Sequence, residues 1–260
     1  MPRFPKLQYQ ILSLKGAEVV GVTKSEFNSF DPSVLGLGNI GATSQPTDAI
    51  AAVFDLQGFT NFCKQIEPHL SVPSYLNSFL TWLMKQLREE MRRCDSGDNV
   101  VLFCPLPFFV KFLGDGLLVL WDCTSMNMTA QLNILVSVSE ICDKYGREFL
   151  RSLRSKVVEP PTALRCGVAR GTVFSIGDGK DFVGSCINMA ARLQKLPGVS
   201  FVFNRRGFDI EARKDAFFTK TICIRQAAIR GIGDHELIGL LTLDLGSMAA
   251  ADRKLYKPAK

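Results

Sequence analysis

Two aspartates occupy positions at which a strand gives way to a turn. Asp55 ends the apolar run 49–54, and Asp115 lies in a Gly-Asp-Gly turn between the apolar runs 108–113 and 117–121. Two carboxylates that are brought close repel each other unless a divalent cation lies between them. We therefore expect a metal site here, with Mg²⁺ as its natural occupant. Taken singly, each residue has a plainer interpretation, Asp55 as a helix cap and Asp115 as a turn residue.

Gly58 is expected to turn the chain after Asp55 into a helix that begins around Thr60. Its first backbone N–H groups would point outward and favour a phosphate chain. They belong to Gln57, Gly58, Phe59 and Thr60. Carboxylates for a metal beside amides for a phosphate form the layout that two-metal phosphoryl transfer requires.

A second pair of polar residues shares one face of a short helix expected over 187–196. Asn188 and Arg192 are four residues apart, so both side chains project from the same side. The plainer interpretation is a surface amide and a surface ion pair.

The order of the expected elements predicts the fold. A strand over 49–54 precedes a helix from Ser71 to Arg93, the hairpin around Asp115, a helix over 128–155, and strands over 163–169 and 172–176. An Asp178-Gly179 turn, the 187–196 helix and strands over 199–203, 220–225 and 236–241 follow. This is an α+β, ferredoxin-like βαββαβ arrangement, an antiparallel sheet with both helices packed on one face. Its first strand lies beside its third, which would bring Asp55 and Asp115 to one edge.

Composition limits the classes of function. The chain has 260 residues, of which 47% are hydrophobic and 22% charged, and its net charge of +6 is too weak and too dispersed to indicate nucleic acid as a partner. Its eight cysteines show no CxxC pair, as expected of core residues in a reducing cytoplasm. The apolar stretch 100–121 is interrupted by Lys111 and Asp115, so we expect no membrane span. We divide the chain into an arm and linker (1–47), a main domain (48–245) and a tail (246–260).

Three motifs resemble those of the class III adenylate and guanylate cyclases. Residues 53–60, VFDLQGFT, resemble the FxDxxGFT signature, with Val53 in place of the leading Phe. Residues 111–115, KFLGD, resemble the KxxGD hairpin, and residues 184–193, GSCINMAARL, resemble the GxxVNxAARL helix. The resemblance spans about 48–241 in the right order. It implies a lyase that converts a ribonucleoside triphosphate to a 3′,5′-cyclic nucleotide and pyrophosphate.

The resemblance also implies roles for individual residues. Two ions, Mg²⁺ or Mn²⁺, would bind Asp55, Asp115 and the backbone carbonyl of Leu56. Asn188 would orient the ribose, and Arg192 would stabilise charge on the α-phosphate. Arg230, in a weaker motif, would contact the terminal phosphates. The family's active site lies between two protomers, so a homodimer with two shared sites is expected.

The identity of the base is left open between two interpretations. Lys111 and Asp181 match the residues with which adenylate cyclases read adenine, whereas guanylate cyclases usually have Glu and Cys there. The free-standing layout and the region from Asp55 to Pro73 look like the pyrimidine cyclases of bacterial Pycsar antiphage systems, which make cyclic UMP or cyclic CMP for a partner effector. We favour the pyrimidine product, with adenylate cyclase as the alternative.

Two other classes of protein remain as alternatives. A catalytically inactive cyclase-like module, which binds a nucleotide or only dimerises, would be expected to lack one of the four catalytic positions, and all four are present. An RNA-binding domain on the same sheet needs exposed aromatics on its central strands, whereas Phe108 and Phe109 lie in an apolar run.

Overall fold

The chain folds into two compact units. The computed structural model describes residues 9–29, 35–65, 68–153, 157–212 and 217–259. The larger unit comprises Thr47–Val173 and Gly184–Lys260, and the smaller unit comprises Met1–Pro46 and Phe174–Val183. The candidate metal acids and the Asn188/Arg192 helix all belong to the larger unit.

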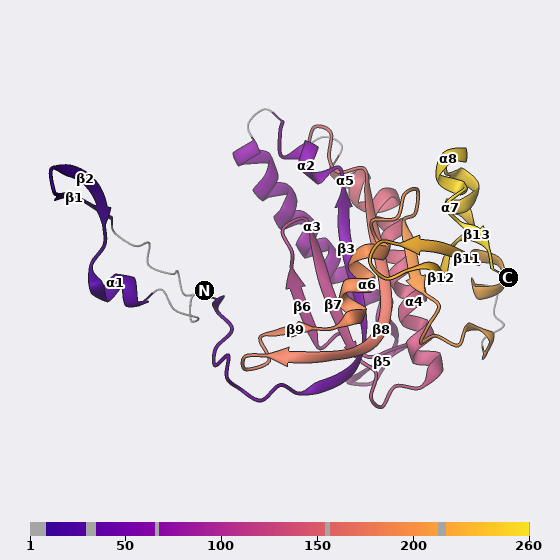
Figure 1. Ribbon diagram of the computed structural model, residues 1–260. Helices are drawn as coiled ribbons and strands as arrows, with labels where there is room; N and C mark the ends of the chain where they lie inside the picture. Colours follow the sequence, from indigo (N-terminus) through magenta and orange to yellow (C-terminus); the bar gives the residue numbers. More distant parts are fainter. Residues whose placement is uncertain (1–8, 30–34, 66–67, 154–156, 213–216, 260) are drawn as a thin grey trace. The chain divides into compact units, whose positions relative to one another are not determined.

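The larger unit contains the predicted βαββαβ core (Figure 1). Its elements, in chain order, are β3 (Pro46–Gln57), α3 (Pro68–Met91), β6 (Phe109–Phe112), β7 (Gly116–Asp122), α4 (Met128–Lys144) and β8 (Ala163–Ile176). The main sheet continues through β10 (Phe201–Asn204), β12 (Gly233–Leu241), β11 (Ile222–Ile229) and β13 (Lys257–Pro258). The strand order is β13-β11-β12-β10-β8-β3-β7-β6, so β3 lies beside β7 as predicted. The α+β fold class is confirmed.

Strand β3 is apolar on both faces because it lies in the middle of the sheet. It pairs antiparallel with β7 from Ala49 opposite Asp122 to Asp55 opposite Gly116. Its alternate residues Phe54 and Leu56 face the main core, so Asp55 faces the other side of the sheet. Such doubly buried strands appear in sequences as continuous apolar runs.

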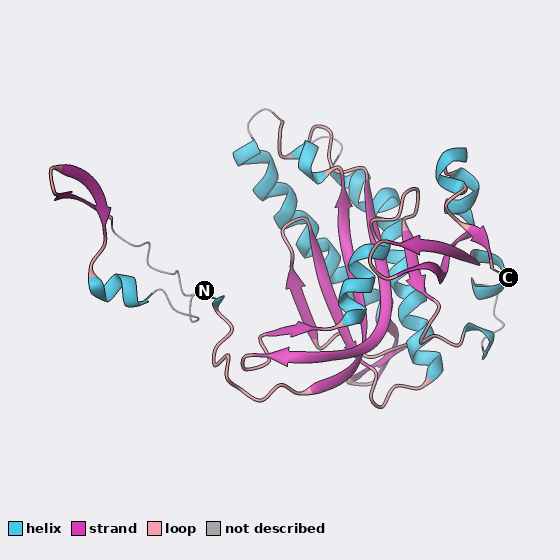
Figure 2. Ribbon diagram, in the orientation of Figure 1, coloured by secondary structure: helices cyan, strands magenta, loops and turns pink. Residues whose placement is uncertain are grey.

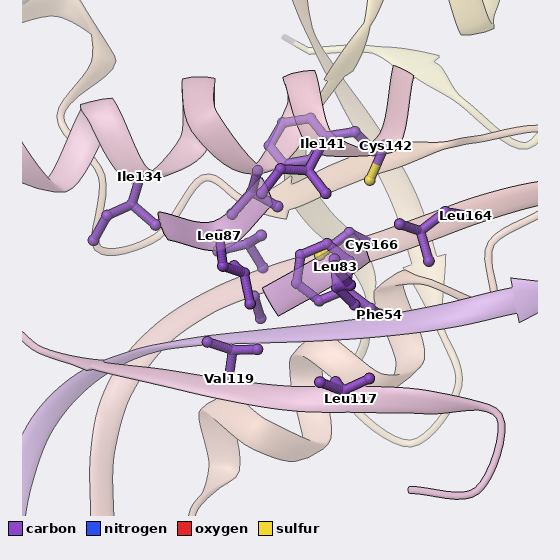
Figure 3. Packing of buried hydrophobic residues seen from close by; sticks show 14 of the residues in the cluster. Phe54, Leu83, Leu87, Leu117, Val119, Ile134, Ile141, Cys142, Leu164 and Cys166 are labelled. Atoms are coloured by element: carbon purple, nitrogen blue, oxygen red, sulfur yellow. The ribbon is translucent and has the colours of Figure 1, made fainter. Parts of the chain in front are cut away.

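Helices α3 and α4 cover the core face of the sheet, as Figure 2 shows. Helix α3 begins at Pro68, which suits the first helical position, and buries one residue per turn along one face. These side chains, with others from α4, β3, β7 and β8, form the core that Figure 3 shows; the labelled residues are Phe54, Leu83, Leu87, Leu117, Val119, Ile134, Ile141, Cys142, Leu164 and Cys166.

A buried hydrogen-bonded pair joins α3 to the residue that follows α4. The hydroxyl of Tyr75 donates to that of Tyr145 at 2.6 Å, and Tyr145 donates to the carbonyl of Pro161 at 2.6 Å. Burial raises the pKa of both phenols, so both stay neutral donors. Each polar atom in this apolar region therefore has a partner.

Some elements differ from their predicted extents. The expected helix 128–155 is α4, followed by a π-helical turn (Tyr145–Phe149) and α5 (Leu150–Leu153), while residues 154 and 155 lie outside the described residues. The π-turn keeps Tyr145 and Phe149 both buried, with ring centroids 5.5 Å apart. The strands expected over 163–169 and 172–176 are one strand, β8, because the backbone at Gly171 stays extended.

The hairpin of β4 (Arg92–Ser96) and β5 (Asn99–Leu102) was not predicted. The segment beyond residue 241 contains α7 (Thr242–Ser247) and α8 (Ala250–Arg253), and β13 pairs with β11. The hydroxyl of buried Tyr256 donates to the carbonyl of Pro197 at 2.5 Å. Within the described residues after 246, Met248 and Tyr256 are thus buried, and β13 extends the main sheet.

The described part of the smaller unit includes a hairpin, a short helix and the end of β8 with its partner strand. Strands β1 (Gln10–Leu14) and β2 (Ala17–Gly21) form a hairpin, and α1 (Lys24–Ser29) follows. Strand β9 (Asp181–Val183) pairs with the end of β8 across the predicted Asp178-Gly179 turn. Ser175 exchanges hydrogen bonds with Gln45, which fixes the end of the linker on this hairpin.

Candidate active site

The end of the β3–β7 pairing brings the main chain of Asp115, in the turn directly before β7, next to the end of β3. Asp55 lies opposite Gly116, and the N–H of Leu56 donates to the carbonyl of Asp115 at 3.1 Å. Opposed Cα atoms in an antiparallel pair are about 4.5–5.5 Å apart. Asp115 is therefore held beside Asp55 by the main chain, before any ligand is considered.

Gly116 permits this close approach. A Cβ atom at this position would lie 1.8 Å from the carbonyl oxygen of Phe54. No side chain fits there without moving backbone, so the residue after Asp115 must be glycine for β7 to reach β3 at Asp55. The Gly-Asp-Gly turn thus has a steric reason as well as a conformational one.

Arg165, which the sequence interpretation missed, contacts Asp55 directly. Its Nη2 lies 2.5 Å from Oδ2 of Asp55, and the two side chains are 21% and 14% exposed. Its Nε is buried and has no hydrogen-bond partner among the described residues. Leu164, Cys166 and Val168 face the core, so alternation along β8 puts Arg165 on the Asp55 side of the sheet. A period-two interpretation of 163–169 would have singled it out as the one charge on that face.

The donor set around Asp55 fits a hard divalent cation. Two carboxylates and the Leu56 carbonyl are the oxygen ligands that Mg²⁺ and Mn²⁺ prefer. The guanidinium of Arg165 against Asp55 shows that this position already accommodates a cation. Within the described ranges, no cluster of three or more His, Cys, Asp or Glu side chains forms a metal site. The metal assignment therefore depends on the pair Asp55 and Asp115, and it stays a prediction.

The predicted phosphate-binding amides lie where β3 ends. Gly58, at φ 90°, precedes the short helix α2 (Phe59–Phe62), and its carbonyl accepts from the N–H groups of Asn61 and Phe62. Gln57, Gly58 and Thr60 are exposed. The role of 57–60 toward a triphosphate stays a prediction.

Asn188 and Arg192 line one cavity of about 570 Å³. Both lie on α6 (Ser185–Leu193), and both are exposed. This helix begins two residues before its predicted start at Ile187. The cavity is also lined by residues that the sequence interpretation did not single out, among them Arg170, Cys186, Asn204, Arg206 and Glu236. The structure thus confirms that Asn188 and Arg192 share a surface, while their roles stay predictions.

Two of these further residues are poor candidates for chemistry. The guanidinium of Arg170 forms an ion pair with Asp48 at 2.6 Å and donates a hydrogen bond to the side-chain carbonyl of Gln131 at 2.8 Å. The hydrogen bond to Asp48 raises the pKa of Arg170. Burial raises the pKa of the Cys186 thiol to about 11, so it is a neutral thiol at physiological pH. Both residues support the wall of the cavity.

Arg230 contacts Arg192 through its main chain. Its carbonyl oxygen accepts a hydrogen bond of 2.7 Å from Nη1 of Arg192, and its own side chain is exposed. The role of the Arg230 side chain toward the terminal phosphates stays a prediction.

The acids and the Asn/Arg pair do not share a cavity in one chain. Among the described residues that line the 570 Å³ cavity, neither Asp55 nor Asp115 occurs. Asp55 contacts β8 at Arg165, whereas the cavity contacts β8 at Ala169 and Arg170. Four residues of strand span about 13 Å. The two sets therefore lie at separate places on one chain.

The predicted base-reading residues lie in different units. Lys111 is exposed on β6 opposite Leu118, in the larger unit. Asp181 begins β9 in the smaller unit, where its Oδ1 accepts from the N–H of Phe182 at 2.9 Å. Their joint role stays a prediction.

Several solved structures that resemble this chain are adenylyl or guanylyl cyclases or parts of them. The adenylyl cyclase CyaB from P. aeruginosa is 17% identical, with a TM-score of 0.56 over 77% of this chain and 96% of that one. The chain has the class III cyclase fold. The catalytic core of a rhodopsin-guanylyl cyclase with converted specificity, in complex with ATPαS, is 13% identical, with a TM-score of 0.54 over 77% and 98%.

A third match is the non-canonical dimeric guanylyl cyclase domain of the RhoGC fusion protein from the aquatic fungus Blastocladiella emersonii. It is 12% identical, with a TM-score of 0.50 over 77% of this chain and 97% of that one. No protein-family model matches the sequence, and no curated protein matches it. At these identities the likeness is one of fold.

In the described part of the chain, no helix combines the length and the apolarity needed to cross a bilayer.

Proposed function

We propose that this chain is a nucleotide cyclase, which converts a ribonucleoside triphosphate to a 3′,5′-cyclic nucleotide and pyrophosphate. The observation that carries the proposal is the β3–β7 pairing that holds Asp115 beside Asp55, with a cation already against Asp55. The fold shared with adenylyl and guanylyl cyclase domains supports it.

In the proposed reaction the 3′-oxygen attacks the α-phosphorus, the bond to the β-phosphate breaks, pyrophosphate leaves and the 3′-hydroxyl proton passes to solvent. Asp55, Asp115 and the Leu56 carbonyl would hold two divalent cations, Mg²⁺ or Mn²⁺, which supply Lewis-acid stabilisation of the phosphates. Asn188 orients the ribose, and Arg192 donates to the α-phosphate oxygens as charge develops there. The amides of 57–60 and Arg230 bind the phosphate chain.

Because each chain carries two separated half-sites, the proposed active unit is a homodimer. The acids of one protomer meet Asn188 and Arg192 of its partner, which gives two equivalent sites. An isolated chain cannot bring a substrate to both half-sites at once, so a monomer is expected to be nearly inactive.

The substrate class that we propose is a pyrimidine triphosphate, UTP or CTP. The support is the resemblance to the pyrimidine cyclases of antiphage systems, in which cyclic UMP or cyclic CMP activates a partner effector. ATP is the alternative, because Lys111 and Asp181 match the adenine-reading pair of adenylate cyclases. Both products come from the same chemistry at phosphorus.

The test is to incubate the full chain with each of the four ribonucleoside triphosphates and Mn²⁺, and to identify the cyclic product by mass. Asp115→Asn keeps the shape of the turn residue and removes its charge, so we expect turnover to fall by about 10²- to 10³-fold. Asp122→Asn, at the other end of β7, is the matched control and should keep wild-type turnover. A folded Asp115→Asn variant with full activity would refute the assignment.

The shared site is tested by mixing two inactive variants, Asp55→Ala and Arg192→Ala. In an equal mixture, random pairing makes about half of the dimers hybrid, and each hybrid has one complete site of two. About a quarter of wild-type activity should return. No recovery, under conditions in which hybrid dimers are detected by mass, would count against the two-chain site.

A further inference from the structure

The turn between β11 and β12 lies directly under the guanidinium of Arg192. The N–H of Ile232 donates to the carbonyl of Ile229 at 2.9 Å, which closes a four-residue turn. Gly231, at φ 69°, is the third residue of that turn, where a positive φ favours glycine. The carbonyl of the preceding residue, Arg230, accepts the hydrogen bond from Arg192.

The guanidinium occupies the space that a side chain at position 231 would need. A Cβ atom built on Gly231 would lie 2.8 Å from Nη1 of Arg192 and 3.4 Å from both Cζ and Nη2. The hydrogen bond to the Arg230 carbonyl and the close approach to Gly231 both restrict the position of the Arg192 guanidinium. A long, exposed arginine side chain otherwise keeps considerable rotamer freedom.

We propose that Gly231 is a positioning residue for Arg192. It lets the turn form, and its bare α-carbon lets the guanidinium lie against the turn so that Nη1 reaches the Arg230 carbonyl. The remaining N–H groups of the guanidinium are then presented to the cavity in a defined direction. Arg192 is thus preorganised before substrate arrives, which is the condition under which an electrostatic donor is most effective.

The effect of a methyl group at this position follows from what it would meet. The far end of a flexible side chain can move aside, so Gly231→Ala should fold, at a cost of about 1–2 kcal/mol for alanine at positive φ. The displaced guanidinium would lose its hydrogen bond and its direction. A misplacement of about 1 Å can cost up to about 10²-fold in rate, so we expect kcat to fall by about 10- to 100-fold with KM changed by less than about threefold.

The proposal rests on the proposed function for its kinetic consequence, and a double-mutant cycle tests it. If Gly231 acts through Arg192, then Gly231→Ala should lower kcat in the wild-type background and have no further effect in Arg192→Ala. Gly97→Ala is the matched control, since Gly97 also has a positive φ, 58°, and no atom lies within 4 Å of its Cβ position. It should cost similar stability and leave kcat unchanged.

A readout without turnover separates the two proposals. In protein labelled with ¹⁵N-arginine, the guanidinium signals of Arg192, identified by their loss in Arg192→Ala, should show slowed rotation in wild type and in Gly97→Ala, but not in Gly231→Ala. That result with no cyclase activity would keep the positioning role and sink the proposed function. Unchanged Arg192 signals in Gly231→Ala, or equal losses of kcat in both backgrounds of the cycle, would overturn the positioning role.

Discussion

Replacing Arg165 by methionine removes the cation that contacts Asp55 while keeping much of the volume of the side chain. The separation of Nη2 from Oδ2 is 2.5 Å, and the carboxylate is only 14% exposed. In the variant, the carboxylate of Asp55 would lose this ion pair in a mostly buried position. The wild-type protein avoids the free-energy cost of a mostly buried carboxylate without this ion pair. A divalent cation bound to the variant would also remove this cost.

The size of the effect follows from the geometry. At an effective dielectric constant of about 20, unit charges 2.5 Å apart attract by about 7 kcal/mol, but the loss of hydration cancels most of this. Removing one partner of a fully buried pair costs about 3–5 kcal/mol, and an exposed pair contributes about 0–1 kcal/mol. With both side chains partly exposed, we expect a loss of about 2 kcal/mol, or roughly 4–8 °C in Tm.

The assay is chemical or thermal unfolding in EDTA and again in Mn²⁺. Arg165→Met should be less stable than wild type in EDTA and should recover more on adding Mn²⁺, because the cation replaces the lost charge. Arg147→Met is the control, since the Arg147–Asp143 pair has a similar distance, 2.7 Å, but side chains that are 53% and 55% exposed. Its loss should stay below about 1 kcal/mol and should not respond to metal. If Arg165→Met matched wild type in EDTA, or if Mn²⁺ stabilised both equally, the reasoning about this locus would be wrong.

Three further predictions concern stability. Tyr145→Phe should lower the free energy of unfolding by about 1–3 kcal/mol, since it leaves the Pro161 carbonyl and a buried phenol without a partner; urea unfolding measures it, and a change under about 0.3 kcal/mol would contradict it. Gly116→Ala should cost about 3 kcal/mol or more and weaken Mn²⁺ binding, because its Cβ would meet the Phe54 carbonyl; calorimetry with Mn²⁺ checks the second part. Burial raises the pKa of Asp244. The contribution of this carboxyl group to stability is therefore present below its unfolded pKa of about 3.9 and is lost as the pH rises through the folded pKa. Asp244→Asn should flatten that part of the stability–pH profile, and an unchanged profile would contradict the predicted direction of the pH dependence.

The central half of the fold could be predicted from the sequence because its signals are local and strong. The apolar run before Asp55 is continuous because β3 is buried on both faces, and α3 repeats a buried residue once per turn. The Gly-Asp-Gly turn between two apolar runs specifies the β6–β7 hairpin. Once these elements are ordered as βαββαβ, the topology itself places β3 beside β7, so the adjacency of Asp55 and Asp115 followed without knowledge of the register.

The features that escaped prediction depend on contacts between distant residues. Arg165 has no informative spacing from Asp55, since 110 residues separate them, and only the pairing of β8 beside β3 brings them together. The β4–β5 hairpin is exposed at every position, so it carries no buried period. The contact between Arg192 and the Arg230 carbonyl involves a main-chain atom, which no side-chain pattern can report.

Both half-sites hold their principal charged group in place without help from a second chain. Asp55 is fixed by Arg165 and Arg192 by the Arg230 carbonyl, so each protomer would enter a dimer with these groups already oriented. Forming the proposed site then requires little further loss of side-chain freedom, and the remaining requirement is that two protomers meet. The cost of this arrangement is that a cation at the proposed metal site would have to compete with Arg165 for Asp55. The Arg165→Met and Gly231→Ala variants therefore perturb opposite halves of the proposed site, so a hybrid dimer of the two chains should carry both defects in one site and neither in the other.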